Sequence, residues 1–207
     1  MEITVKSRPQ TAFYLHIALI VLAVLGIFLS FMELTPAKFF TFYTQDSNMF
    51  SLIVSIIYVA TYKKGISPLT KKLRFAATSC LMLTFFVVIL VLGPSYGVEF
   101  YPWLLFHGAN FLYHVACPLL SLVSFIIFED NQDLQFIDTL KALIPTLIYA
   151  VIIIFLNIIY VVDGPYPFLK VHNQSVLMSM IWFLVILGFN WLITLGVRRL
   201  KNVKGLE

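Results

Sequence analysis

The chain has 207 residues, of which 60% are hydrophobic and only 12% are charged, and its formal net charge is +4. Apolar runs of about 20 residues recur along it, each long enough to cross ~30 Å of hydrocarbon at a helical rise of ~1.5 Å per residue. This composition excludes a soluble globular domain and predicts a polytopic membrane protein.

The apolar runs predict six membrane-spanning helices. In chain order they are Thr11–Met32, Phe42–Tyr62, Phe75–Gly93, Trp103–Phe128, Leu140–Val162 and Val176–Val197. We therefore expect one all-α transmembrane domain over residues 1–207. The first run is too long for the core of a signal peptide and lacks a small-residue cleavage site, so we expect it to be retained as a helix.

The basic residues predict the orientation, because short cytoplasmic loops collect Lys and Arg. Of the 14 Lys and Arg residues, only Lys38 and Lys170 fall on one side of the six spans. The other side holds Lys6, Arg8, Lys63, Lys64, Lys71, Lys72, Arg74, Lys141, Arg198, Arg199, Lys201 and Lys204. We expect both termini to be cytoplasmic in a cell membrane. The positive charge is thus a topology signal and predicts no nucleic-acid partner.

The residues that commonly hold metals or form disulfides give little sign of either. The acidic residues after the fourth span are predicted to form a solvated loop rather than a metal site; they are Glu129, Asp130, Asp133 and Asp138. Cys80 and Cys117 lie at depths that differ by roughly 9 Å, so we expect no disulfide between them. Neither a P-loop nor a dinucleotide fingerprint is present, and we expect no cofactor.

Polar residues inside the spans are the candidates for function, because a polar group in hydrocarbon is unfavourable without a partner. Depth can be counted from the cytoplasmic boundary at ~1.5 Å per residue. It places Thr44, Asn48, Asn110 and His114 in one layer of the outer half of the bilayer, with Asn157 at a similar depth. Thr44 and Asn48 are four residues apart, as are Asn110 and His114, so each pair shares a helix face. The two faces are predicted to meet across a pocket.

Other interpretations of these polar residues stay open. A membrane Thr often bonds the carbonyl four residues earlier, and Asn or His can simply hold helices together. Thr41 is expected at the interface, with Gln45 and Asp46 near outer water. His16 and Asn190 have no predicted partner layer.

Two outer loops are rich in turn-forming and aromatic residues. They are the segments 93–97 and 163–169, the latter with Tyr166. Such segments either cap a cavity or anchor helix ends at the interface, and the sequence favours neither.

The layer contains a combination typical of acyl transfer. A Thr hydroxyl needs a base to become a nucleophile, and a neutral His is the usual base near neutral pH. We expect Thr44 to be the nucleophile and His114 the base, with an Asn amide orienting the imidazole or stabilising an oxyanion. The expected substrate is a membrane lipid or fatty-acid ester. The residues expected to bind it are Asn48, Asn110, Ser47, Thr41, Tyr166 and Asn157.

Three segments carry a resemblance to a known family. They are Phe39–Asn48 before an apolar span, His114–Pro118 within a span, and Gly164–Leu169 after the fifth span. In order and spacing the chain resembles the androgen-induced and androgen-dependent multipass membrane hydrolases, and more closely their six-span bacterial relatives.

The resemblance implies an intramembrane threonine hydrolase, whose animal members cleave esters of fatty acids with hydroxy fatty acids. The family Thr lies at the start of the second span with a polar residue three positions later, which Thr44 satisfies through Ser47. Thr41 matches the local string of some animal members equally well. The family His precedes a Pro in the fourth span, as His114 precedes Pro118, although some animal members carry an extra residue between them.

Two non-enzymatic interpretations compete with an esterase. In the first, the same polar layer binds or transports a lipid or small molecule without turnover. In the second, the chain is a structural helper of a membrane complex. The lack of paired broken helices and of acidic residues at mid-depth speaks against transport.

Overall fold

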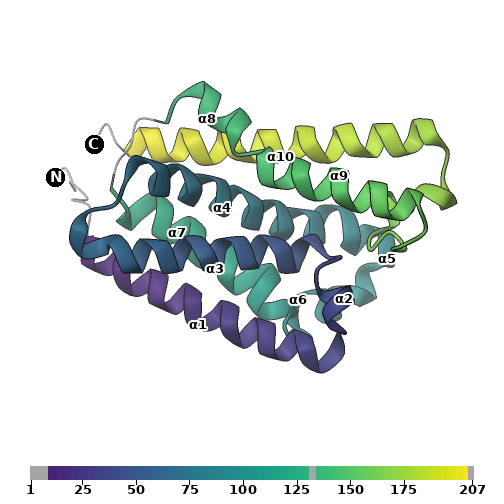
Figure 1. Ribbon diagram of the computed structural model, residues 1–207, viewed down its shortest axis with the longest axis horizontal. Helices are drawn as coiled ribbons and strands as arrows, with labels where there is room; N and C mark the ends of the chain where they lie inside the picture. Colours follow the sequence, from purple (N-terminus) through teal and green to yellow (C-terminus); the bar gives the residue numbers. More distant parts are fainter. Residues whose placement is uncertain (1–8, 131–133, 205–207) are drawn as a thin grey trace.

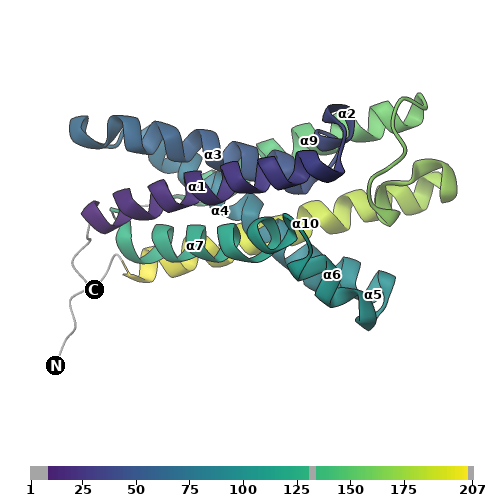
Figure 2. The same ribbon diagram turned by 90° about the horizontal axis from the view of Figure 1, so that it is seen from below.

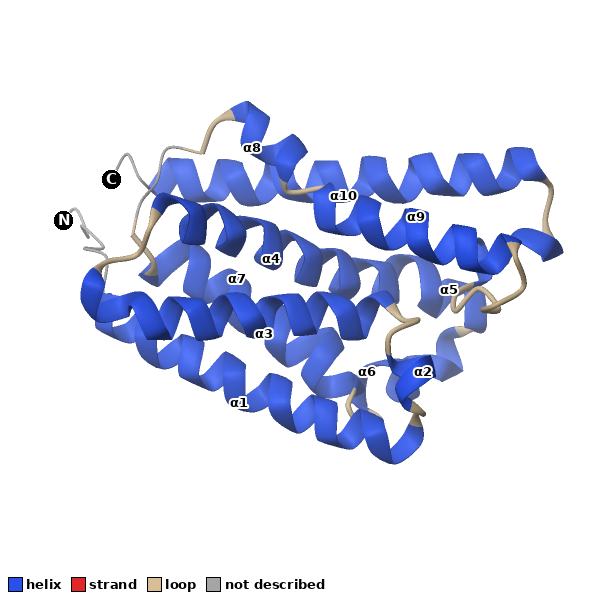
Figure 3. Cartoon of the chain, viewed as in Figure 1, coloured by secondary structure: helices blue, strands red, loops and turns tan. Residues whose placement is uncertain are grey.

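The computed structural model describes residues 9–130 and 134–204. Within these ranges every regular element is helical, as Figure 3 shows. The predicted all-α class is therefore confirmed. Lys6, Arg8 and Asp133 lie outside the described residues.

The long helices are α1 (Pro9–Glu33), α3 (Tyr43–Thr61), α4 (Pro68–Val87), α9 (Ile144–Ile158) and α10 (Val176–Lys204). The shorter ones are α2 (Pro36–Phe39), α5 (Gly93–Tyr96), α6 (Tyr101–Phe106), α7 (Cys117–Val123) and α8 (Phe136–Lys141). Three π-helical segments continue or join them, at Val88–Leu92, Phe111–Ala116 and Ser124–Phe128. Four single 3₁₀ turns lie in the connections, at Tyr62–Lys64, Val98–Phe100, Pro167–Leu169 and Val171–Asn173.

In the part of the chain that the structure describes, five helical stretches are long and apolar enough to cross a membrane. They are Pro9–Glu33, Pro68–Tyr96, Phe111–Phe128, Phe136–Ile158 and Val176–Val203. The second predicted span, α3, has 19 residues but does not qualify. Its first turns carry Thr44, Gln45, Asp46, Ser47 and Asn48, which lower its apolar character.

Helix α4 occupies the centre of the bundle and packs against α3, α7 and α10. Figure 2 shows it between α3 on one side and α7 with α10 on the other. In its most apolar stretch 72% of the residues are buried, against 11% in α10. Helices α9 and α10 instead expose large apolar side chains such as Phe155 and Leu184. Such outward apolar faces suit contact with lipid.

The bundle has two distinct ends. Helix α1 begins and α10 finishes at the same end (Figure 1). The short helices α2, α5 and α6 gather at the opposite end, near the loop between α9 and α10. We call this second end the outer end, after the orientation that the sequence predicts.

The fourth predicted span is shorter than expected. Helix α6 ends at Phe106, and the chain turns through Gly108, with φ 50°, before the π-helical segment begins at Phe111. The prediction that this span starts at Trp103 is therefore wrong. A left-handed glycine interrupts a run whose apolar composition gave no sign of a break.

Small residues let α1 approach its neighbours closely, as is common between membrane helices. Its buried face includes Ala12, Ala23, Gly26 and Ser30. A Cβ atom built on Gly26 would lie 2.3 Å from Cε1 of the Tyr113 ring. The ring therefore fills the space that the glycine leaves, and this contact fixes the position of the π-helical segment Phe111–Ala116.

A buried ion pair lies near the end opposite the outer end. Arg74 Nη2 lies 2.8 Å from Glu129 Oε1, and His16 Nε2 lies 3.2 Å from the same oxygen. Ser124 Oγ donates to this carboxylate, and Lys201 Nζ donates to the Glu129 backbone carbonyl. All four partners are buried.

The prediction that the acidic residues after the fourth span are all solvated is therefore wrong for Glu129. It is wrong for Asp138 as well, which is buried and pairs with Lys72 at 2.9 Å. His16, for which no partner was predicted, takes part in the same network as Glu129. Cys80 and Cys117 are free thiols.

Candidate functional site

The structure brings Thr44 and His114 together. Thr44 Oγ1 lies 3.3 Å from His114 Nε2, and both residues are buried. Thr44 is in the first turn of α3, and His114 is in the π-helical segment Phe111–Ala116. This hydrogen bond joins elements that are 70 residues apart in the chain.

The second nitrogen of His114 fixes the tautomer. Nδ1 lies 2.5 Å from the backbone carbonyl oxygen of Leu104 in α6. A carbonyl can only accept, so Nδ1 carries the proton and Nε2 presents a lone pair to the Thr44 hydroxyl. The imidazole is thus oriented as a base toward this hydroxyl. The break at Gly108 places α6 so that Leu104, ten residues before His114, can supply this carbonyl.

The π-helical geometry around His114 has a cause in the sequence. Pro118 has no N–H, so it cannot donate to a carbonyl one turn earlier, and such positions bend helices. The Asn48 side chain supplies a donor here, with Nδ2 3.4 Å from the Tyr113 carbonyl and 2.8 Å from the Thr44 carbonyl. Asn48 therefore links α3 to the segment that carries His114. It lines neither of the two cavities described below, so its predicted contact with substrate is not seen.

Tyr166 contributes from the loop between α9 and α10. Its hydroxyl accepts the backbone N–H of Thr44 at 3.3 Å. This N–H is one of the first in α3, which have no partner inside the helix. Burial raises the pKa of Tyr166 to about 12, so its hydroxyl keeps a proton that can be donated. This loop therefore caps the site, one of the two roles that the sequence left open.

Two cavities meet at Thr44. The larger, which we call the outer cavity, has a volume of ≈ 710 Å³ and is lined by both Thr44 and His114. The smaller, which we call the apolar slot, has a volume of ≈ 50 Å³ and lies between α4, α9 and α10. Thr44, Leu92 and Tyr166 line both. Thr44 is therefore part of the wall of both cavities.

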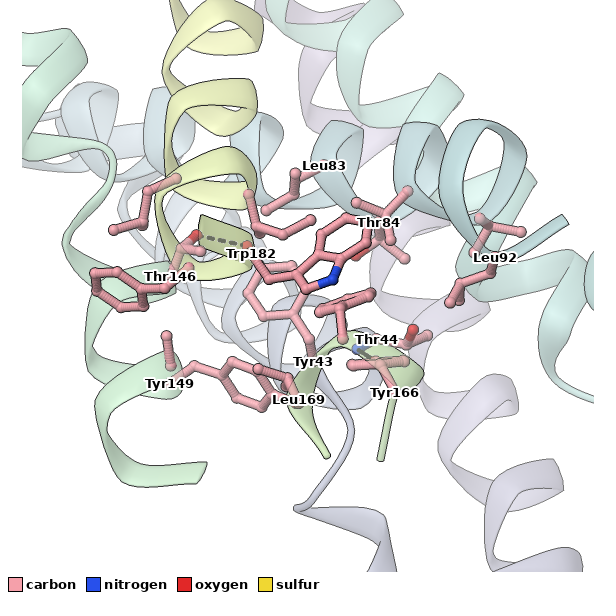
Figure 4. A pocket seen from close by; sticks show the side chains of 17 residues that line it. Tyr43, Thr44, Leu83, Thr84, Leu92, Thr146, Tyr149, Tyr166, Leu169 and Trp182 are labelled. Carbon is pink, nitrogen blue, oxygen red and sulfur yellow. Dashed lines mark hydrogen bonds between the residues drawn. The ribbon is translucent and has the colours of Figure 1, made fainter. Parts of the chain in front are cut away.

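Figure 4 shows the apolar slot, with Trp182 among aliphatic and aromatic side chains. Several of its polar groups are already hydrogen-bonded within the protein. The hydroxyls of Tyr43 and Thr146 lie 2.7 Å apart, and Asn190 Nδ2 donates to Thr146 at 2.8 Å. Asn190, for which no partner was predicted, thus helps to leave the slot apolar.

The other predicted binding residues have different surroundings. Asn110 lines the outer cavity, but its amide donates to the Trp103 carbonyl. Ser47 lines neither cavity and bonds Thr84 at 2.9 Å. Thr41 is bonded to the Lys38 carbonyl at 2.7 Å and also lies outside both cavities.

Asn157 is not part of the polar layer. Its amide donates to the Val162 carbonyl, and its Oδ1 accepts the Val171 N–H. It thereby holds the loop that follows α9. Asn157 lies in the last turn of α9, where its side chain caps the departing chain.

Sequence reasoning missed several groups at this site. The Leu104 carbonyl belongs to the backbone and leaves no signal in the sequence. Gln45 was expected near outer water, yet it is 9% exposed and lines the outer cavity. Glu33 and Glu99 line the same cavity and come from segments that lay outside the predicted spans.

Among the residues that the structure describes, no three His, Cys, Asp or Glu side chains come close enough to hold a metal ion. Comparisons of the chain with protein-family models, curated proteins and solved structures find no match. The site must therefore be interpreted from its own geometry.

Proposed function

We propose that this chain is a membrane-embedded hydrolase of a lipid-like carboxylic ester. The observation that carries the proposal is the 3.3 Å contact between Thr44 Oγ1 and His114 Nε2 at the wall of the outer cavity. A hydroxyl facing the lone pair of an oriented imidazole is the arrangement that general-base activation of a nucleophile requires.

This geometry supports the following reaction. His114 Nε2 takes the Thr44 proton as Oγ1 attacks the ester carbonyl carbon. The Tyr166 hydroxyl can donate to the oxyanion of the tetrahedral intermediate. The imidazolium then returns its proton to the leaving alcohol, and an acyl-threonine remains. Water, activated by the same imidazole, releases the acid and regenerates Thr44.

The two cavities suggest how the ester is held. The first carbons of the acyl chain enter the apolar slot, which is lined mainly by aliphatic and aromatic side chains and has a volume of ≈ 50 Å³. The alcohol portion occupies the wider outer cavity. The scissile carbonyl then lies beside Thr44, which lines both.

We also propose six membrane spans with both termini cytoplasmic in a cell membrane. Helix α3 supports this, because its 19 residues extend about 28 Å at helical rise. The common location of the start of α1 and the end of α10 supports an even number of crossings. Membership of the multipass threonine hydrolases, including their bacterial members, remains a proposal that rests on the motif resemblance.

A lipid-binding protein without turnover is the second candidate. One observation favours it: in the described residues, His114 is bonded to the Leu104 carbonyl rather than to a carboxylate. An imidazolium formed during catalysis would then lack the charged partner that serine hydrolases provide. Formation of a covalent acyl-enzyme separates the two candidates.

A fluorophosphonate probe tests the proposal, because it reacts preferentially with an activated hydroxyl. We expect the purified protein in nanodiscs to be labelled and Thr44→Ala to lose the label. Thr41→Ala is the matched control, because the Thr41 hydroxyl lies outside both cavities. Labelling that is unchanged in Thr44→Ala would contradict the proposal, and loss only in Thr41→Ala would move the nucleophile to Thr41.

A further inference from the structure

The outer cavity carries negative charge. Glu33 and Glu99 line it, and its described lining residues include neither Lys nor Arg. Each carboxylate lies over a glycine with positive φ. A Cβ on Gly108 would lie 2.7 Å from Glu33 Oε1, and one on Gly97 would lie 2.6 Å from Glu99 Oε1. The glycines thus leave space for both carboxylates at the cavity.

A buried acceptor without a partner lies at the same cavity. Gln45 is one of the residues that line the cavity, it is 9% exposed, and its buried Oε1 receives no hydrogen bond from the described residues. An unpaired buried acceptor is unfavourable, so it favours a ligand that brings an N–H or O–H donor. This observation is independent of the two carboxylates and favours the same kind of ligand.

Aromatic rings complete the lining. They belong to Phe42, Tyr96, Phe100, Trp103 and Tyr166. Aromatic faces attract cations, and amines are commonly bound where rings and carboxylates occur together. The lining therefore combines three features that suit a positively charged group.

The outer end as a whole carries more acidic than basic side chains, as the lining of the outer cavity does. This end carries four carboxylates, those of Glu33, Asp46, Glu99 and Asp163, against the lysines Lys38 and Lys170. Lys170 is paired with Asp163 at 3.1 Å, and Lys38 does not line the cavity. Glu33 Oε1 lies 3.4 Å from His107 Nε2. The field at the outer cavity therefore favours a cation over an anion.

We propose that the alcohol portion of the substrate, which occupies the outer cavity, carries a positively charged amine. This inference rests on the proposed function for the identity of the bond that is cleaved, although binding of the amine does not require cleavage. It differs from what the motif resemblance implies. An ester of a hydroxy fatty acid would place a carboxylate near Glu33 and Glu99, where like charges repel.

The test compares three non-hydrolysable ligands that share a dodecyl chain. They are 2-(dodecyloxy)ethylamine, 2-(dodecyloxy)ethanol and (dodecyloxy)acetate, which carry a cation, a neutral hydroxyl and an anion. Binding to the protein in phosphatidylcholine nanodiscs is measured by titration calorimetry, and binding to empty nanodiscs is subtracted. We expect the amine to bind about tenfold more tightly than the alcohol, and the acetate most weakly.

Variants locate the effect. Glu33→Gln combined with Glu99→Gln should reduce the preference for the amine to about twofold or less. Asp163→Asn is the matched control, because Asp163 belongs to the outer end but does not line the cavity, and it should keep the preference. Equal binding of amine and alcohol, binding of neither, or an unchanged preference in the double variant would overturn the proposal.

A further arm identifies the source of the amine. If it belongs to a lipid headgroup, nanodiscs of phosphatidylethanolamine should compete and weaken binding of the amine ligand. Unchanged binding would support a single-chain amino-alcohol ester. Because the ligands are ethers, these results do not depend on turnover, so a failure of fluorophosphonate labelling and a failure of amine binding can be told apart.

Discussion

The ring of Tyr113 packs directly against Gly26, in space that any larger residue at position 26 would fill. The contact joins α1 to the π-helical segment Phe111–Ala116, and the next residue after Tyr113 is His114. Packing on a helix that contributes no reacting group therefore fixes the position of the imidazole.

Gly26→Ala should disturb both stability and the site. The Tyr113 ring is buried and cannot move freely, so we expect a loss of about 1–3 kcal/mol in the free energy of unfolding and slower fluorophosphonate labelling. Gly188→Ala in α10 is the control, because nothing lies within 4 Å of its added Cβ. Denaturant titration in mixed micelles measures the first effect. Equal stability of the two variants would contradict the packing argument.

His114→Asn should remove the base and preserve much of the local structure. The Asn amide can still donate toward the Leu104 carbonyl, but it offers no basic lone pair to Thr44. We expect the rate of fluorophosphonate labelling to fall by about 10²- to 10⁴-fold. His107→Asn serves as the control, since His107 does not line the outer cavity. Similar rates in both variants would exclude His114 as the base.

Glu129→Gln should be strongly destabilising. The substitution leaves the Arg74 guanidinium buried without a carboxylate partner. Removing one partner of a buried ion pair lowers the free energy of unfolding by about 3–5 kcal/mol. Asp130→Asn is a matched control, because the side chain of Asp130 is 48% exposed and its pair with Lys71 spans 3.6 Å. Such surface pairs contribute about 0–1 kcal/mol. Similar free energies of unfolding for the two variants would argue against the buried network.

Because the pKa of Glu129 is shifted in the folded protein, we expect the free energy of unfolding to depend on pH. Burial alone would raise the pKa of Glu129, but the Arg74 charge and hydrogen bonds from His16 and Arg74 hold it well below its usual range. A carboxyl whose pKa is lower in the folded state stabilises the fold fully above its ordinary pKa of about 4.3, and this contribution is lost as the pH falls further. The difference in unfolding free energy between the wild type and Glu129→Gln should therefore be constant near neutrality and shrink below about pH 4. A constant difference down to the lowest accessible pH would contradict this.

The sequence could predict the proximity of Thr44 and His114, because both lie on helices whose depth follows from the residue count. The partners that complete the site could not be found in this way. The Leu104 carbonyl faces His114 only because the chain breaks at Gly108, and an apolar run does not reveal such a break. Gln45 looked like a residue for outer water, yet the loop that carries Tyr166 covers this end of α3.

Depth alone also produced errors. Asn157 has a suitable depth but lies in the last turn of its helix, where its side chain closes a loop. Local composition predicted a solvated loop for Glu129. In the structure Glu129 is buried against Arg74, which lies 55 residues earlier in the chain. The direction in which a helix residue faces depends on the rotation of the helix about its axis, and the burial of a loop residue depends on contacts with distant segments. One sequence contains little information about either.

Mass spectrometry of the fluorophosphonate-labelled protein locates the adduct within the chain and so tests whether Thr44 is the nucleophile. We predict a single modified peptide with the phosphonyl group on the Thr44 hydroxyl, in protein that retains an intact His114. An adduct on Thr41 or any other residue, or no adduct on a folded protein, would contradict this prediction.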